Sequence, residues 1–132
     1  MRYLYLSELW VWKIIKKGET DMSKPEVIRV DNPQGGCGYL VKESILTPGE
    51  KLGNVSMYAR ITLGPKSTLG YHKHEGNGEI YFVLEGEAVY NDNGEKRIIG
   101  PGEVTRTPSG FSHGIENNSD QPFVFMALIT ED

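Results

Sequence analysis

Two histidines placed one residue apart, with a carboxylate close behind, are the residues of this chain whose types and spacing favour chemistry. His72 and His74 stand one residue apart, Glu79 follows five residues later, and His113 lies far downstream. Imidazole and carboxylate side chains that come together can bind a metal ion. The alternative is that the two neighbouring histidines are only polar residues on the solvated face of a strand.

The local spacing also suggests how the first three side chains meet. In a strand, residues i and i+2 project from the same face, so His72 and His74 are expected to point the same way. The flexible segment 75–78 precedes Glu79, which begins the next apolar run. If those two strands pair as a hairpin, Glu79 returns beside the imidazoles.

Short strands are the elements that must position these residues. Glycine and proline interrupt the chain after residue 31, and no long apolar stripe of helical period occurs there. The apolar runs between these breaks are 38–46, 55–63, 79–85, 87–90, 95–99, 103–107, 112–117 and 123–129. The segment 91–94 (Asn-Asp-Asn-Gly) predicts a hairpin, because Asn and Gly tolerate positive φ. Short strands at close, regular spacing predict an all-β sandwich or barrel.

The first 21 residues differ from the rest of the chain. An apolar stretch within residues 3–17 favours a helix, although its many β-formers also allow a strand. It is interrupted by Glu8, is too short for a membrane span, and has its basic residues after the apolar part. Met22 and the Ser-Lys-Pro after it are typical of a bacterial protein start. We expect an N-terminal extension at 1–21, with an over-long gene start as the alternative, and one domain at 22–132.

Two stretches resemble the two sequence motifs of the cupin family. The first is HKHEGNGEIYFVLEG at residues 72–86, and the second is GEVTRTPSGFSHGIEN at residues 102–117. They stand in the family's order and together contain all three histidines of the chain. One departure is Lys66, because a glycine commonly stands six residues before the first histidine of the family motif. This departure concerns loop geometry and leaves the ligands intact.

The resemblance implies an all-β cupin jelly-roll, a double-stranded β-helix barrel, around an interior cavity. It also implies that His72, His74, Glu79 and His113 bind one divalent transition metal, namely Mn, Fe, Ni, Zn or Co. Such a site leaves one or two coordination positions open for water or a ligand, unlike a closed structural zinc site. A degenerate, empty site is the alternative, but no histidine or glutamate of the motifs is replaced.

Three further residues are candidates for catalytic roles. Tyr81 shares the strand parity of Glu79, so it is expected on the cavity wall, with core packing as the alternative. Arg60 and Arg106 lie on predicted strands whose inward face the sequence does not fix. An inward arginine indicates an anionic ligand, because burying a cation without a partner is costly. Exposure at a sheet edge is the alternative.

The resemblance leaves two functions open, because cupins include decarboxylases, isomerases, dioxygenases and plain binding proteins. The first is a metalloenzyme that acts on a small anionic or carbonyl metabolite, which chelates the metal. The second is a non-catalytic, metal-dependent binding or accessory protein. Small bacterial cupins similar to this chain include some labelled oxalate decarboxylases. Leu69 argues against that reaction, because two-domain oxalate decarboxylases look to have an arginine at the matching position.

Composition limits the partners and the compartment. The net charge is −4 and no basic cluster is long enough to follow a phosphate backbone, so nucleic acid is not expected as a partner. The single cysteine, Cys37, cannot form an internal disulfide, which favours a reducing compartment, and we expect a cytoplasmic protein. By analogy with small cupins we expect a homodimer with a small-molecule ligand and no membrane partner.

Overall fold

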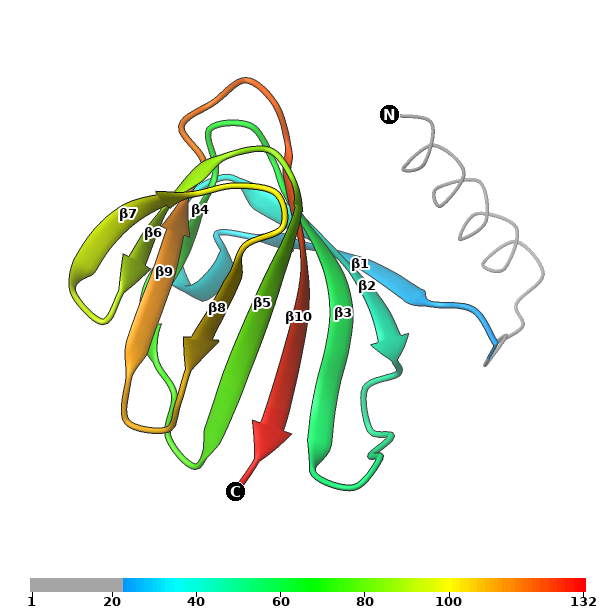
Figure 1. Ribbon diagram of the computed structural model, residues 1–132. Helices are drawn as coiled ribbons and strands as arrows, with labels where there is room; N and C mark the ends of the chain where they lie inside the picture. Colours follow the sequence, from blue (N-terminus) through cyan, green and yellow to red (C-terminus); the bar gives the residue numbers. More distant parts are fainter. Residues whose placement is uncertain (1–22) are drawn as a thin grey trace.

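The computed structural model describes residues 23–132, which form two antiparallel sheets and one short 3-10 helix (Figure 1). The larger sheet has the order β1-β2-β3-β10-β5-β8, and the smaller sheet has the order β4-β9-β6-β7. The elements are β1 (Glu26–Asp31), η1 (Pro33–Gly35), β2 (Tyr39–Leu46), β3 (Val55–Leu63), β4 (Thr68–Lys73), β5 (Asn77–Glu85), β6 (Ala88–Asp92), β7 (Glu95–Ile99), β8 (Val104–Thr107), β9 (Ser112–Glu116) and β10 (Phe123–Glu131). Each predicted apolar run overlaps one strand, and the expected all-β jelly-roll is confirmed.

The predictions for the N-terminal segment fall outside the part of the chain that the structure describes. These are the helix within residues 3–17 and the extension at 1–21. Within residues 23–132, no helix is long and apolar enough to cross a bilayer.

Alternation along the strands places the core between the two sheets. In β5, Glu79, Tyr81 and Val83 are buried, whereas the residues between them are exposed. The sheets face each other across this interior (Figure 1). Large apolar side chains of the core are Leu63, Tyr90, Ile99, Ile115, Phe123 and Phe125. Burial of each such side chain contributes about 1.5–3 kcal/mol to folding.

The proposed hairpin between the histidine strand and the glutamate strand is wrong. β4 pairs with β9 in the smaller sheet, whereas β5 pairs with β10 and β8 in the larger one. The chain crosses between the sheets directly after His74, and Gly76 supplies the positive φ of 77° that this crossing needs. Glu79 therefore faces the histidines from the opposite sheet.

Positive φ angles explain both the hairpin turn at 91–94 and the departure from the family motif at Lys66. The predicted hairpin turn connects β6 to β7, and its central residues Asn93 and Gly94 have φ values of 52° and 102°. This is the conformation that favours Asn-Gly in two-residue hairpins. Lys66, at the position where the family motif has glycine, also has a positive φ of 56°. The glycine preference therefore reflects a left-handed residue, which lysine adopts here.

Asn117 closes the second motif stretch and has a structural role. Its buried side-chain amide donates hydrogen bonds to the carbonyls of Leu63 at 3.3 Å, Gly64 at 3.0 Å and Gln121 at 2.8 Å. These contacts join the end of β3 to the loop before β10. The side chain is thus held at the end of the barrel by backbone groups.

Candidate metal centre

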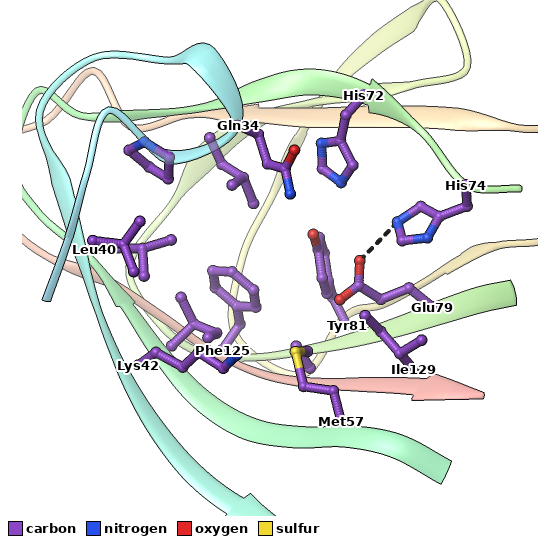
Figure 2. A pocket seen from close by; sticks show the side chains of 15 residues that line it. Gln34, Leu40, Lys42, Met57, His72, His74, Glu79, Tyr81, Phe125 and Ile129 are labelled. Atoms are coloured by element: carbon purple, nitrogen blue, oxygen red, sulfur yellow. Dashed lines mark ion pairs between the residues drawn. The ribbon is translucent and has the colours of Figure 1, made fainter. Parts of the chain in front are cut away.

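The four predicted ligands converge inside the barrel from both sheets. His72 lies on β4 and pairs directly with His113 on β9. His74 follows the end of β4, and Glu79 lies on β5 of the opposite sheet. Their ligand atoms all lie within 4.8 Å of one another, and three of the four residues are buried. Figure 2 shows the imidazoles of His72 and His74 directed toward the same region as the Glu79 carboxylate.

A β-bulge aims His72 into the barrel. Leu69 pairs with Ile115 and His72 pairs with His113, so β4 contains one extra residue between these two pairs. Without a bulge, residues three apart in a strand project from opposite faces. Both Leu69 and His72 nevertheless line the same cavity. The bulge therefore places His72 on the same inward face of β4 as Leu69.

The ligand atoms have a spacing that suits a metal ion. Nε2 of His74 lies 3.0 Å from Nε2 of His113, and Oε1 of Glu79 lies 3.0 Å from the former and 3.1 Å from the latter. Atoms bound at right angles to one ion, each about 2.1 Å from it, are about 3.0 Å apart. Tetrahedral angles would give about 3.4 Å. The triangle therefore fits one face of an octahedral site.

Hydrogen bonds on the outer nitrogens fix the tautomers of two histidines. Nδ1 of His72 donates to the carbonyl of Gly70 at 2.7 Å, and Nδ1 of His74 donates to Oδ1 of Asn77 at 2.8 Å. In the neutral imidazoles, Nε2 is then left with a free lone pair. Metal-binding histidines typically have such partners on the second nitrogen. Both side chains thus present an unprotonated nitrogen to the centre.

His113 is held by a buried polar and aromatic environment. Its Nδ1 lies 2.8 Å from Oγ1 of Thr107 and 3.1 Å from the hydroxyl of Tyr90. The ring of Tyr81 stacks on the face of the imidazole, with ring centroids 4.8 Å apart and an interplanar angle of 16°. The imidazole is fully buried, so these contacts leave it a single orientation.

The electrostatics of the cluster favour an ion pair in the absence of a cation. A hydrogen bond to the Glu79 carboxylate raises the pKa of His74, although burial opposes this. Burial also raises the pKa of Glu79, but hydrogen bonds from His113 and His74 outweigh it, so that pKa is lowered. Burial lowers the pKa of His72. At acidic pH, protonated His74 and the Glu79 carboxylate therefore form an ion pair in the metal-free site.

These shifts predict a bell-shaped contribution to the stability of the metal-free protein. The raised pKa of His74 stabilises the fold below its ordinary value of 6.5, and this is lost as pH rises through the folded pKa. The lowered pKa of Glu79 stabilises it above 4.5, and this is lost as pH falls through the folded pKa. With chelator present, the difference in unfolding free energy between wild type and Glu79→Gln should be largest between pH 4.5 and pH 6.5. A difference independent of pH would contradict the ion pair.

A cavity of about 200 Å³ lies beside the cluster. Most of its wall is apolar, and the residues that line it are Val30, Pro33, Gln34, Leu40, Lys42, Met57, Ile61, Leu69, His72, His74, Glu79, Tyr81, Phe125, Ala127 and Ile129 (Figure 2). Apart from the cluster, its polar side chains are Gln34, Lys42 and Tyr81. A small ligand in this cavity would therefore be in contact with the cluster at one end and with few other polar groups.

Of the three catalytic candidates, the structure brings only Tyr81 to the cavity. Arg60 lies between the inward residues Ala59 and Ile61 of β3, so it projects from the outer face, where it forms an ion pair with Glu43 at 3.6 Å. Arg106 is exposed because its neighbours in β8, Thr105 and Thr107, point inward. The two arginines therefore have no part in the cavity.

Two cavity residues were not identified from the sequence. Lys42 on β2 shares a face with the buried Leu40, and this parity was the available signal. Gln34 lies in the short helix η1 between β1 and β2, where no strand pattern assigns an inward face.

Comparisons with known proteins agree with this fold and with the placement of the motifs. The chain matches the family described as Cupin domain (Cupin_2) over residues 59–129, which contain both motif stretches. It is 41% identical over 101 residues to the oxalate-binding protein of Thermotoga maritima, covering 76% of this chain and 84% of that protein. It is 28% identical over 135 residues to a glucose-6-phosphate isomerase of Thermococcus litoralis, covering 98% of this chain and 65% of that protein.

A similar crystal structure is that of a Thermotoga maritima protein described as a predicted oxalate decarboxylase. It superposes with a TM-score of 0.77 at 38% sequence identity, covering 85% of this chain and 97% of that one. The similarity therefore extends over nearly the whole barrel.

Proposed function

The chain belongs to the cupin family, and from this premise we propose that it binds one divalent transition metal through His72, His74, Glu79 and His113. The observation that carries the proposal is the triangle of two imidazole nitrogens and one carboxylate oxygen, with sides of 3.0–3.1 Å. Electron pairs directed at one point repel each other unless a cation or proton lies among them. The donor set suits Mn, Fe, Co, Ni or Zn.

We propose a small chelating anion as the ligand of this centre. The cavity of about 200 Å³ opens beside the cluster, and it is smaller than pockets for drug-sized ligands, which are about 300–1,000 Å³. A bound metal with open positions polarises and orients an oxygen ligand. Because a 41% identical relative is named as an oxalate-binding protein, oxalate is the first ligand to test.

A metal-dependent enzyme is the second candidate, and Tyr81 is the observation that favours it. Its hydroxyl lies 3.3 Å from Nε2 of His113, and burial raises its pKa well above the ordinary value, so it stays protonated near neutral pH. Such a hydroxyl can donate a hydrogen bond or a proton to an anion in the cavity. Release of carbon dioxide from oxalate by the metal-loaded protein would support this candidate, and intact oxalate would favour binding alone.

The metal proposal is tested by elemental analysis of protein purified without a nickel affinity step. We expect about one divalent ion per chain, and thermal unfolding at a higher temperature with metal than with chelator. A ligand that binds only the folded state stabilises it by about 2.7 kcal/mol at a hundred times its dissociation constant. Background metal content together with unchanged unfolding temperatures would refute the proposal.

Thr107→Val is expected to weaken metal binding about tenfold. The substitution keeps the side-chain volume but removes the hydroxyl 2.8 Å from Nδ1 of His113, and loss of such partners typically costs 10–100-fold in affinity. The hydroxyl of Tyr90 remains, which favours the lower end of that range. Competition with a chromogenic chelator measures the effect. Thr62→Val, an equally buried threonine on the outer face of β3, should leave the affinity unchanged.

A further inference from the structure

Lys42 places a cationic side chain on the wall of the ligand cavity. On β2 it pairs with Ile61 of β3, which also lines the cavity, and the two residues share the inward face. Figure 2 shows Lys42 on the side of the cavity away from His72 and His74. Within residues 23–132, no carboxylate forms an ion pair with it. A half-buried ammonium on a largely apolar wall would be stabilised by an anion placed beside it.

Gln34 is the second polar group, and a fixed loop presents it. Its backbone is left-handed, with φ 51° and ψ 37°, which costs free energy for a residue other than glycine. The loop is tied to β4, because the amide of Thr68 donates to the carbonyl of Cys37 at 2.9 Å and Oγ1 of Thr68 accepts from the amide of Cys37 at 2.8 Å. Figure 2 shows its side-chain amide directed into the cavity.

The charges around the cavity match a dianion. Among the described residues that line it, Glu79 is the one carboxylate and Lys42 is the one lysine or arginine. One carboxylate, one ammonium and a bound divalent cation leave two positive charges in the cavity. A ligand with two negative charges neutralises them, whereas a monoanion leaves one uncompensated.

We propose that Lys42 and Gln34 bind the oxygens of a metal-chelated dicarboxylate that point away from the metal, and that they select a small dianion over monoanions of similar size. This inference rests on the proposed metal centre. Oxygens that are not bound to the metal face a mostly apolar wall, where an unpaired polar atom is costly. Lys42 supplies the charge for them, and Gln34 supplies an amide donor of fixed position.

The experiment compares oxalate with glyoxylate, which has a similar size and one negative charge. Calorimetric titrations use metal-loaded wild type, Lys42→Met and Gln34→Leu, with Lys51→Met as the matched control because Lys51 is exposed and outside the cavity. Elemental analysis comes first and should show equal metal content in all four proteins. Lys42→Arg keeps the charge and is the second variant at this position if Lys42→Met does not fold.

We expect wild type to bind oxalate more tightly than glyoxylate. Lys42→Met should weaken oxalate binding about 10–100-fold, as expected for loss of a charged hydrogen bond, and should weaken glyoxylate binding much less. Gln34→Leu should weaken oxalate binding about 3–10-fold, the range for a neutral hydrogen bond. Lys51→Met should leave both affinities unchanged, and Lys42→Arg should keep the preference for oxalate.

Two results would overturn the inference while the metal centre stands. One is wild type that holds metal but binds both anions equally. The other is a Lys42→Met protein that holds metal and keeps the wild-type preference for oxalate. That result would mean that Lys42 contacts solvent and not the bound anion. Wild type without metal would instead refute the proposed function, and this subsite with it.

Discussion

Replacing Glu79 by glutamine is expected to weaken metal binding at least a hundredfold. The substitution keeps the size of the side chain and removes the only negative charge among the four ligands. Oε1 of Glu79 lies 3.0 Å from Nε2 of His74 and 3.1 Å from Nε2 of His113, so it forms one corner of the ligand triangle. Loss of an outer hydrogen-bond partner alone costs about 10–100-fold, and loss of an anionic ligand should cost more.

Titration with Mn²⁺ and Zn²⁺, in competition with a chelator, measures this effect. Glu85→Gln is the matched control, because Glu85 lies on the same strand and is exposed. The control should bind metal as wild type does and should gain the same rise in unfolding temperature. The Glu79→Gln protein should fold, as judged by circular dichroism, and gain no such rise. A variant that binds metal within threefold of wild type would remove Glu79 from the site.

The strands were predictable because their boundaries are encoded locally, and the ligand set was predictable from the resemblance of two stretches to the cupin motifs. Glycine, proline and Asn-Gly turns divide the chain into short apolar runs, and each run became a strand. The ligands His72, His74, Glu79 and His113 were identified through the resemblance of two stretches to the cupin motifs, and the structure brings their ligand atoms within 4.8 Å of one another. Turn residues and residue spacing are properties of single segments, so they do not depend on how the sheets pair.

The pairing of the sheets was not predictable from those local signals. The short segment before Glu79 is compatible with a hairpin and with a crossing between sheets, and the structure has the crossing. β1 was missed, because it is an edge strand in which most side chains are exposed and its apolar pattern is weak. Both the crossing after His74 and the assignment of β1 as a strand depend on which strands pair with which.

The inward or outward orientation of strand residues was also not predictable from the sequence. Bulges interrupt the register of β2 with β3 and of β4 with β9, so simple parity fails across them. Arg60 and Arg106 were left open because the sequence alone does not fix which face of a strand points inward, and both face outward. Lys42 was overlooked because a lysine on a strand is ordinarily solvated, whereas here it shares the inward face of its sheet.

Gly70→Ala is expected to destabilise the protein by about 2–4 kcal/mol, because Gly70 lies in the bulge that positions His72. A methyl group at this position would lie 2.0 Å from the carbonyl oxygen of Gln34, 2.9 Å from its carbonyl carbon and 3.0 Å from the amide nitrogen of Gly36. All three are backbone atoms, so no flexible side chain can move aside. Overpacking typically costs about 1–3 kcal/mol, and a backbone clash belongs at or above the upper end.

The same substitution should also disturb the site, since the carbonyl of Gly70 accepts the hydrogen bond from Nδ1 of His72 at 2.7 Å. Denaturant unfolding with chelator measures the stability change, and Gly100→Ala is the control. A methyl group there would meet its nearest atom at an ordinary 3.6 Å, so its effect should stay within about 1 kcal/mol. If Gly70→Ala costs no more than Gly100→Ala, the loop that carries Gln34 cannot be packed against β4 as described. A large cost combined with weakened metal binding would instead show that the bulge couples this loop to the first histidine.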